Sequence, residues 1–502
     1  MAGGPSDGST YSKKTAFVYI FNLIVGVGAL ALPYGFSKAG LVLGLLFLAA
    51  IGFLAFITTT WLIEGLSIAN FILVNKKSEK IIGDEDDNRK QQQQKRPIPN
   101  ENDSLINSEY SDNRILQANV EDRYLLESNC NNEFTEQFEI KKRVEVGEMS
   151  KMFLGNIGYK VFYGVLIIYL FGDLSIYAAT VPTTLANVTG GWGKFTDYSV
   201  YYFYLFLFAC FVGPFSLFNF QKTKYLQFAT LITRNVAFLL MIILSIIFIA
   251  QGNGASIKQV PMFNISELAS IFGVSIYSFM THHSIPGFLT PISKKDRLFT
   301  LMGLDFILVF IAYGTLCVVS LFAFGSVTNP TCATSSTSIH TFIPCQIQSL
   351  YIYNFTSYNN KFISDFLSLF PVFTLSTNYI LISITLRNNL LQLITWKQDK
   401  ISPFVRNVIF SLTSSLIPVG VAFCTRNVSL LVNITGSYAG LGIMFVMPAL
   451  ISFYSNKMLT EYYHISNPKK SPFSNKFFYL LILLISVICL VLATWKIIIT
   501  YK

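Results

Sequence analysis

Two glycines and a proline interrupt an otherwise apolar run near the start of the chain. The run, FNLIVGVGALALPYGFSKAGL, occupies positions 21–41 and contains Gly26, Gly28 and Pro33. In membrane hydrocarbon every backbone N–H and C=O needs a partner, so a helix can break only where it lines a cavity. A half-helix N-terminus then presents N–H donors to an anion, while unwound carbonyls can hold a cation. The pattern therefore suits an amino acid, which carries both charges. Close helix packing is the alternative use of the glycines.

Substitution of Gly28 distinguishes substrate binding from packing. If a substrate must approach the backbone there, Gly28→Val should insert and fold but lose binding. Poor folding would instead indicate packing. Because Val25 and Val27 are already accepted in this run, we expect the first outcome.

A second apolar run is broken in the same way. The sequence FGVSIYSFMTHHSIPGFLTP, at positions 272–291, contains the polar run 281–284 followed by Pro286 and Gly287. Two interrupted spans at corresponding positions are typical of the binding site of a secondary transporter. The predicted substrate-binding residues are Gly26, Val27, Gly28, Ala29, Tyr277, Thr281 and His282.

Ionisable side chains inside the apolar runs are candidates for coupling. Asp173, in LFGDLSIYAA, could bind an amine or relay a proton, because an intramembrane carboxylate normally faces a cavity or the bundle interior. His282 titrates in the range that proton coupling requires. Hydrogen-bonded packing is the alternative for both. Glu64 and Asp305 lie nearer the ends of their runs, where Arg234 could pair with either as a structural contact.

No metal or cofactor site is expected. His282 and His283 are adjacent, so on a helix they point about 100° apart and cannot easily share a metal ion. No further His, Cys or carboxylate stands at ligand spacing. Nucleophile-elbow, zinc-protease and paired-carboxylate motifs are also missing from the sequence, so we do not expect an enzyme.

The composition places these residues on membrane-spanning helices. Of the 502 residues, 52% are hydrophobic and 13% are charged, and the mean hydropathy is +0.50. About 20 apolar residues span a bilayer as a helix, whereas a barrel would show short alternating segments. We predict an all-α polytopic membrane protein with about eleven transmembrane helices. The apolar runs are 15–36, 41–63, 157–184, 198–218, 226–250, 267–290, 299–325, 364–386, 405–424, 434–454 and 477–499.

The two broken runs are the first and the sixth. Because they are five spans apart, spans 1–5 and spans 6–10 insert in opposite orientations. This is the inverted repeat found in many secondary transporters, with the eleventh helix as an addition.

The basic residues predict a cytoplasmic N-terminus. With residues 76–160 set aside, 16 Lys and Arg then lie on the cytoplasmic side and 7 on the other, as the positive-inside rule requires. The net charge of +10 reflects this asymmetry. We therefore expect contact with anionic lipid of the bilayer and no nucleic-acid partner.

Two long segments separate groups of spans. Residues 76–150 contain 17 of the 27 Asp and Glu, which predicts a disordered cytoplasmic loop that could bind a protein partner and that ends in a helix. Residues 326–363 form a predicted lumenal or extracellular loop, in which Cys332 and Cys345 could form a disulfide. The predicted organisation is an N-terminus at 1–14, helices in 15–75, the loop 76–150, helices in 151–325, the loop 326–363 and helices in 364–502.

Several tracts resemble a known family. Asn22, the Gly26-Val-Gly28 element, Pro33 and Ala39-Gly40 are similar to the first span of amino acid/auxin permeases. The tracts FNLIVGVGAL, YLFGDLSIYAA, FQKTKYLQ, PVFTLSTN, TLRNN and ITGSYAG resemble the transmembrane protein 104 group of that superfamily. The resemblance implies a leucine-transporter-type fold, with a 5+5 inverted repeat plus one extra helix.

The resemblance also implies amino-acid transport coupled to Na⁺ or H⁺. In this fold the Na⁺ lies between the first and eighth spans, which makes Asn22, Thr377 and Asn378 the expected ligands. Asp173 and His282 are the corresponding candidates for a proton.

Together these features predict a secondary active transporter of amino acids or related small zwitterions. We expect it in the plasma membrane or an endolysosomal membrane. The alternative is a transporter-like nutrient sensor or scaffold, which binds an amino acid and signals through the loop 76–150.

The predicted orientation can be tested by glycosylation. Asn187, Asn264 and Asn354 carry Asn-X-Ser/Thr motifs in predicted lumenal or extracellular loops, so each should accept a glycan. Glycosidase treatment of single Asn→Gln variants should show the loss of one glycan for each site. Asn102 has the same motif inside residues 76–150, and its modification would overturn the orientation.

Overall fold

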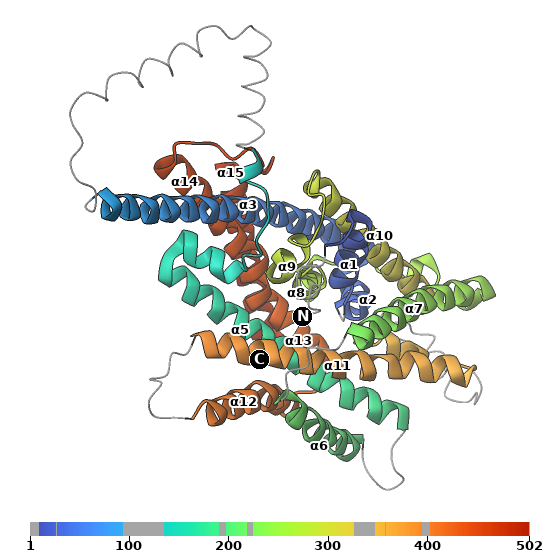
Figure 1. Cartoon of the computed structure of the whole chain (residues 1–502). Helices are drawn as coiled ribbons and strands as arrows, with labels where there is room; N and C mark the ends of the chain where they lie inside the picture. Colours follow the sequence, from blue (N-terminus) through green and yellow to red (C-terminus); the bar gives the residue numbers. More distant parts are fainter. Residues whose placement is uncertain are drawn as a thin grey trace, which may run out of the picture.

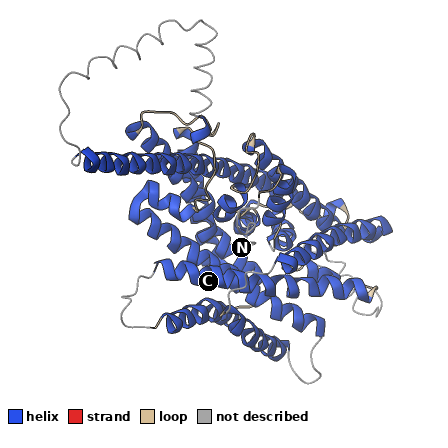
Figure 2. Ribbon diagram, viewed as in Figure 1, coloured by secondary structure: helices blue, strands red, loops and turns tan. Residues whose placement is uncertain are grey.

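The chain consists of helices and loops wherever its structure is described. The computed structural model describes residues 10–26, 28–93, 135–189, 197–217, 224–325, 347–356, 358–393 and 402–500. Figure 2 shows helices without strands in these residues, and a single isolated β-bridge joins Tyr11 to Ile292. The predicted all-α class is confirmed.

The helices correspond to the predicted apolar runs, with shifted ends. The α-helices are α1 (Lys13–Ile24), α2 (Gly28–Ala39), α3 (Leu41–Gln93), α5 (Val146–Thr189), α6 (Asp197–Ser216), α7 (Lys224–Phe248), α8 (Leu268–Ser278), α9 (Ile285–Leu289), α10 (Leu298–Phe324), α11 (Lys361–Leu393), α12 (Pro403–Cys424), α13 (Val428–Thr435), α14 (Met447–Tyr462) and α15 (Lys476–Thr500). α13 and α14 join through the π-helical segments η7 (Gly436–Gly440) and η8 (Gly442–Val446) into one long span.

Within the described residues, nine helices are long and apolar enough to cross a membrane, and the bent pair α1–α2 makes up to ten. The predicted sixth span is the broken pair α8 and α9, of 11 and 5 residues. A total of eleven spans and the inverted repeat therefore stay predictions.

The broken sixth span lies inside the bundle. Figure 1 shows α8 near the centre of the helices, and it packs against α2, α13 and η7. α5 packs along α11 and α12, while α6 and α12 lie side by side at the edge. The non-helical residues that follow α8 are buried, with exposed fractions of 0% for Phe279 and 1% for Thr281. Other helices therefore separate this break from the surrounding lipid.

The sixth span approaches α13 so closely that glycine is required. A Cβ on Gly273 would lie 2.2 Å from the Asn433 carbonyl oxygen, and a Cβ on Gly436 would lie 2.0 Å from the Gly273 carbonyl oxygen. Close backbone approach at small residues is the usual basis of helix packing in membranes, where apolar burial gives little driving force. The π-helical turn at Gly436 lies at this contact, and such turns are frequent near functional sites.

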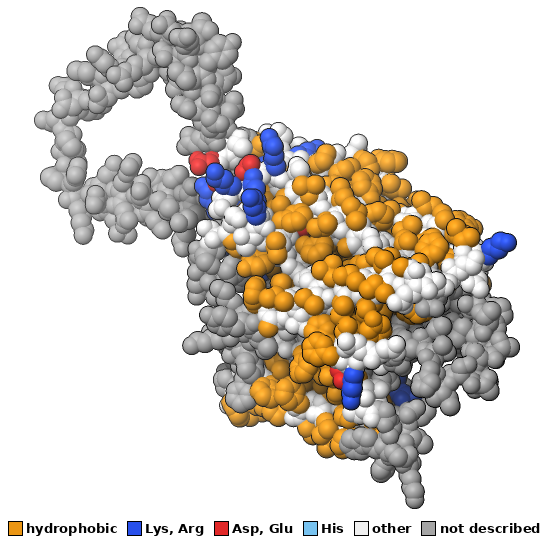
Figure 3. All heavy atoms as spheres, turned by 90° about the vertical axis from the view of Figure 1, so that its right-hand side faces the viewer, with side chains coloured by type: hydrophobic (Ala, Val, Ile, Leu, Met, Phe, Trp, Pro, Cys, Tyr) orange, Lys and Arg blue, Asp and Glu red, His pale blue; other side chains and the backbone are white. Residues whose placement is uncertain are grey.

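The outer surface is apolar, as contact with lipid requires. Phe206 on α6 is 66% exposed, and Leu239 and Ile243 on α7 are 58% and 51% exposed. Figure 3 shows apolar side chains across the middle of one face, with Lys and Arg mainly toward its edges. Soluble proteins rarely expose such continuous apolar area. The chain is an integral multi-pass membrane protein.

The segment predicted to be a disordered loop is ordered at both ends. α3 continues to Gln93, and residues 135–145 dock on α3. Phe138 stacks on Phe71, with ring centroids 4.4 Å apart and an interplanar angle of 12°. Disorder across residues 76–150 stays a prediction: the structure describes ordered residues at the two ends of this segment, while residues 94–134 lie outside the described part of the chain.

Asn70 fixes the far end of the insertion to the near end. Its Oδ1 accepts hydrogen bonds from the N–H of Lys142 at 2.7 Å and of Lys141 at 3.1 Å. The helix predicted before the third span is present as the first turns of α5, before the bend at Gly155 (φ 69°).

The N-terminal residues are tied to the region after the sixth span. The Tyr11 hydroxyl donates to the Phe288 carbonyl, and the Lys13 ammonium pairs with Asp296. The hydrogen bond from Lys13 holds the pKa of the Asp296 carboxyl below its ordinary range.

Two of the predicted glycan acceptors are accessible and one is not. Asn187 is exposed near the end of α5, and Asn264 is partly exposed. Asn354 is fully buried, and its Oδ1 accepts a hydrogen bond from the Gln348 N–H at 2.9 Å. This fold leaves no room for a glycan at Asn354, so that prediction does not fit the structure. The predicted disulfide partners, Cys332 and Cys345, lie outside the described residues.

Removal of the Phe138 ring should release residues 135–145 from α3. Large-to-small changes of buried aromatic residues remove roughly 3–5 kcal/mol of packing, so Phe138→Ala should speed tryptic cleavage at Lys141 and Lys142 by roughly tenfold or more. Mass spectrometry of the tryptic fragments measures this. Phe263→Ala is the matched control, because Phe263 is 56% exposed. Unchanged cleavage in Phe138→Ala would contradict the docked arrangement.

Candidate functional site

The predicted interruption of the first span is present. α1 ends at Ile24, Val25 has an extended backbone (φ −71°, ψ 98°), and α2 is bent by 54° relative to α1. The last carbonyls of a helix have no partner within it. Here Nη2 of Arg234, on α7, donates to the Asn22 carbonyl, and the Tyr313 hydroxyl, on α10, donates to the Ile24 carbonyl at 2.9 Å. The end of α1 is therefore bonded by side chains of two other spans.

The interruption of the sixth span lies against that of the first. α8 ends at Ser278, whose carbonyl oxygen lies 3.2 Å from the same Tyr313 hydroxyl. A Cβ on Gly28 would lie 2.7 Å from the Cα of Ser278. Tyr313 thus joins the two breaks by sharing one proton between two carbonyls.

The two glycines of the first break have different surroundings. Gly28 contacts the Ser278 backbone, which cannot yield to a side chain, so this geometry favours the packing alternative for Gly28 and does not fit good folding of Gly28→Val. A Cβ on Gly26 would meet only the Ile24 carbonyl oxygen, at 3.8 Å. Gly26 is therefore the open glycine of the pair.

A cavity lies beside Gly26. It holds about 490 Å³ of empty space, part of which is open to the surroundings. Its walls come from the break in the first span, α2, α5, α7 and α11. The lining residues are Val25, Gly26, Leu30, Tyr177, Arg234, Phe238, Met241, Phe370, Pro371, Thr374, Leu375 and Asn378.

Arg234 is the charged residue of the cavity wall. Its Nε is buried without a hydrogen-bond partner. Oγ1 of Thr374, in the α11 wall of the cavity, is also buried without a hydrogen-bond partner. The ion pairs found in the described residues do not include Arg234. The predicted pairing of Arg234 with Glu64 or Asp305 is therefore wrong.

Each of those two carboxylates has its own surroundings. Glu64 accepts hydrogen bonds from Ser474 at 2.7 Å, Ser452 at 2.8 Å and Asn456 at 3.0 Å, which supports a structural role. Both carboxylate oxygens of Asp305 are buried without a partner.

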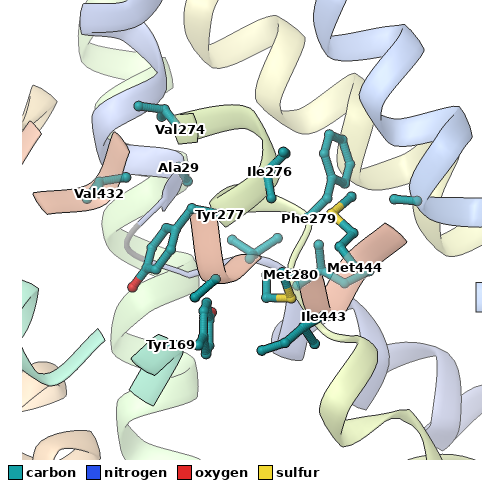
Figure 4. Close-up of a cluster of buried hydrophobic side chains, with 14 of the residues drawn as sticks. Ala29, Tyr169, Val274, Ile276, Tyr277, Phe279, Met280, Val432, Ile443 and Met444 are labelled. Carbon is teal, nitrogen blue, oxygen red and sulfur yellow. The ribbon is translucent and has the colours of Figure 1, made fainter. Parts of the chain in front are cut away.

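Asp173 lies behind the cavity wall. Tyr277 of α8 donates its hydroxyl to Asp173, and Tyr177 of the cavity lining lies one helical turn along α5 from this acid. Figure 4 shows Tyr277 and Tyr169 in the buried cluster that also contains Ala29. Tyr177 therefore brings the cavity wall within one helical turn of a buried acid, although Asp173 and Tyr277 are not themselves lining residues.

Comparison with known proteins relates this arrangement to a family. The family described as transmembrane amino acid transporter protein matches residues 9–80, which include the first break. The chain is 91% identical to the transmembrane protein 104 homolog of Dictyostelium discoideum, over 100% of both chains. It is 36% identical to transmembrane protein 104 of Homo sapiens, over 100% of this chain and 99% of the human one.

The chain belongs to the transmembrane protein 104 family. The Drosophila melanogaster homolog is a more distant relative, 31% identical over 98% of each chain. The permease-type resemblance of the first span is thereby confirmed.

In this transmembrane protein 104 family member, His282 is bonded to α3 and is not part of the cavity lining. Its Nε2 lies 2.9 Å from Oγ1 of Thr58 and 3.1 Å from the Ala55 carbonyl oxygen. The neighbouring His283 ring lies 5.5 Å from the Tyr169 ring, on α5. The adjacent histidines therefore contact different helices, as their spacing predicts. For His282 the geometry favours hydrogen-bonded packing over substrate contact.

The predicted Na⁺ ligands differ in their surroundings. Oδ1 of Asn22 accepts a hydrogen bond from Asn235 at 2.6 Å. Oγ1 of Thr377 donates to the Phe373 carbonyl of its own helix at 2.8 Å, whereas Asn378 lines the cavity. Across the described ranges, no group of three His, Cys, Asp or Glu could hold a metal ion. Of the remaining predicted site residues, Ala29 and Thr281 are buried outside the cavity lining, and Val27 lies outside the described residues.

Two residues of this site carry a weak sequence signal. Arg234 is a cation inside an apolar run, which by itself suggests function. Tyr313 lies in a strongly apolar helix, where a tyrosine is indistinguishable from a packing residue until its hydroxyl partners are known.

Valine substitutions should separate the roles of the two glycines. Gly28→Val forces atoms into the Ser278 backbone, so the folded yield should fall by roughly fivefold or more. Gly26→Val places its atoms in open space, so its yield should stay within about twofold of wild type. Size-exclusion chromatography of the solubilised chain, fused to a fluorescent protein, measures both yields. Equal yields would contradict the assignment.

Proposed function

We propose that this protein is a secondary active transporter of amino acids or related small zwitterions, and that the cavity beside Gly26 binds the substrate. The observation that carries the proposal is the position of this cavity at a broken membrane helix, where Gly26 leaves the backbone uncovered. The match to a transmembrane amino acid transporter family over the same break supports it.

The ends of α1 and α2 suit a zwitterion. The C-terminal end of α1 carries a partial negative charge and the N-terminal end of α2 a partial positive charge. Both ends meet at Val25 and Gly26, which line the cavity. A substrate at this point is exposed to both poles.

We propose protons as the coupling ion. The carbonyl of Asn22, a predicted Na⁺ ligand, already receives the Arg234 guanidinium. The Ile24 carbonyl receives the Tyr313 hydroxyl. A guanidinium stays charged in proteins, and a Na⁺ placed beside it would be repelled strongly where water is scarce. The structure thus has a fixed cation close to the position expected for Na⁺.

Asp173 is the proposed proton carrier. It is 7% exposed, and it accepts a hydrogen bond from the Tyr277 hydroxyl. Tyr177 of the cavity wall lies one turn along the same helix, so a proton on the Asp173 carboxyl group would change the charge beside this wall. Substrate and proton can therefore influence each other across this part of α5.

Uptake into proteoliposomes tests the coupling. Scanning the standard amino acids should identify a substrate whose uptake is unchanged when choline replaces Na⁺, and rises when the outside is more acidic than the inside. Asp173→Asn should remove the stimulation by the proton gradient. Uptake that needs Na⁺ would contradict proton coupling.

Asp305→Asn is the matched control for Asp173→Asn. Asp305 is also a buried carboxylate, but it lies on α10, and neither of its oxygens has a hydrogen-bond partner that could link it to the cavity wall. It should keep its response to the proton gradient. If Asp305→Asn alone abolishes the response, Asp173 is not the carrier.

One observation favours the second candidate, a nutrient sensor. The docked segment 135–145 reaches the broken sixth span, because a Cβ on Gly287, in α9, would lie 3.2 Å from the Arg143 guanidinium. Movement of this span on ligand binding would therefore displace Arg143 and the docked end of the insertion. Ligand binding without uptake in the proteoliposome assay would support the sensor.

A further inference from the structure

We propose that Arg234 binds the carboxylate group of the substrate, and that the substrate is a neutral amino acid with an apolar side chain. This inference rests on the transport function proposed above. It assigns a substrate class to the cavity and a specificity-determining contact to a residue of α7.

The guanidinium has donors to spare. Nη2 is used by the Asn22 carbonyl, whereas Nε is buried without a partner. A guanidinium presents five N–H donors in a planar fork that matches the two oxygens of a carboxylate. The bond to Asn22 fixes the guanidinium at the cavity wall and leaves other donors available.

The described residues of the cavity wall offer no counter-ion for this cation. No Asp or Glu is among the lining residues that the structure describes. The acid behind the cavity wall, Asp173, is bonded instead to Tyr277. Charged groups at membrane depth are normally paired, because leaving them unpaired there costs several kcal/mol. A carboxylate carried in by the substrate would provide the missing partner.

The remaining walls define the rest of the substrate. Leu30, Phe238, Met241, Phe370 and Leu375 form an apolar surface suited to an apolar side chain. Thr374, whose Oγ1 is buried without a partner, and Asn378 offer oxygen acceptors to an ammonium group. A second positive charge on the substrate would find no carboxylate among the described lining residues, so we expect basic amino acids to bind poorly.

Matched pairs of acids and amides test the proposal on wild-type protein. The thermal stability of the purified full-length chain is measured with each of the twenty standard amino acids. Every amino acid that stabilises the protein is then compared with its carboxamide, which keeps the ammonium group and the side chain but loses the carboxylate charge. Loss of a buried charge partner should weaken apparent affinity by roughly 30-fold or more.

Substitution of Arg234, combined with the same acid and amide pairs, tests whether this residue recognises the carboxylate. Arg234→Gln keeps an N–H donor for Asn22 but no charge, so its affinity for the amino acid should fall to that of the wild type for the amide. Its affinity for the amide should change little. Arg234→Lys keeps the charge without the fork and should retain the preference for the acid. Arg387→Gln is the matched control. Arg387 is also buried, but it is not a lining residue of the cavity, and it bonds to Ser411 and the Ser216 carbonyl.

The outcomes are distinguishable. Equal binding of acid and amide by the wild type overturns the role of Arg234, even if no variant folds. Equal weakening of acid and amide in Arg234→Gln also overturns it, since Arg234 would then only position Asn22. Binding of L-lysine in preference to neutral amino acids overturns the substrate class. If none of the twenty amino acids stabilises the wild type, the proposed function itself is wrong.

Discussion

Backbone groups released inside a membrane must find new partners, and the centre of this protein is organised around that requirement. Both broken helices end in the interior, and their free carbonyls are bonded by side chains from other spans. The Tyr313 hydroxyl bonds to the carbonyls at the ends of both α1 and α8, whereas Arg234 donates only to a carbonyl of α1. With these carbonyls bonded, the part of the first break that borders empty space is the backbone at Val25 and Gly26.

The contact between the breaks continues into a third span. Gly28 contacts the backbone of Ser278 at the end of α8. Earlier in α8, Gly273 contacts the backbone of Asn433 in α13 and of Gly436 in η7. Atoms held this closely cannot slide past one another without separating, so α2, α8 and α13 form a continuous packed unit. The cavity lies at the edge of this unit, where it meets α7 and α11.

Composition and the positions of glycine and proline were sufficient to predict the helices and both breaks. They could not predict the direction of each side chain at a break, because helical periodicity is lost there. His282 is the clearest case: it comes four residues after the end of α8, yet its ring is bonded to Thr58 on α3. Gly26 and Gly28 look equivalent in sequence, and only the position of Ser278 distinguishes them.

Long-range pairing was equally inaccessible. An arginine in an apolar run indicates a buried charge, but the partner of that arginine depends on which helices are neighbours in the fold. The sequence suggests that Arg234 pairs with Glu64 on α3 or Asp305 on α10. In the structure Arg234 instead donates a hydrogen bond to the Asn22 carbonyl of α1. The ordered end of the insertion was missed for a related reason. Its charged composition indicates disorder, while the ring of Phe138 and the main chain near it find specific partners on α3.

The bond between Asn70 and the backbone at Lys141 and Lys142 has a consequence for how this family can vary. It closes the chain between these points into a loop whose two ends meet at one place on the membrane domain. The free-energy cost of closing a loop, which comes from the entropy that its chain loses, rises by only about 0.6 kcal/mol for each doubling of the loop length. Segments can therefore be gained or lost between the two ends while the membrane-spanning helices keep their positions.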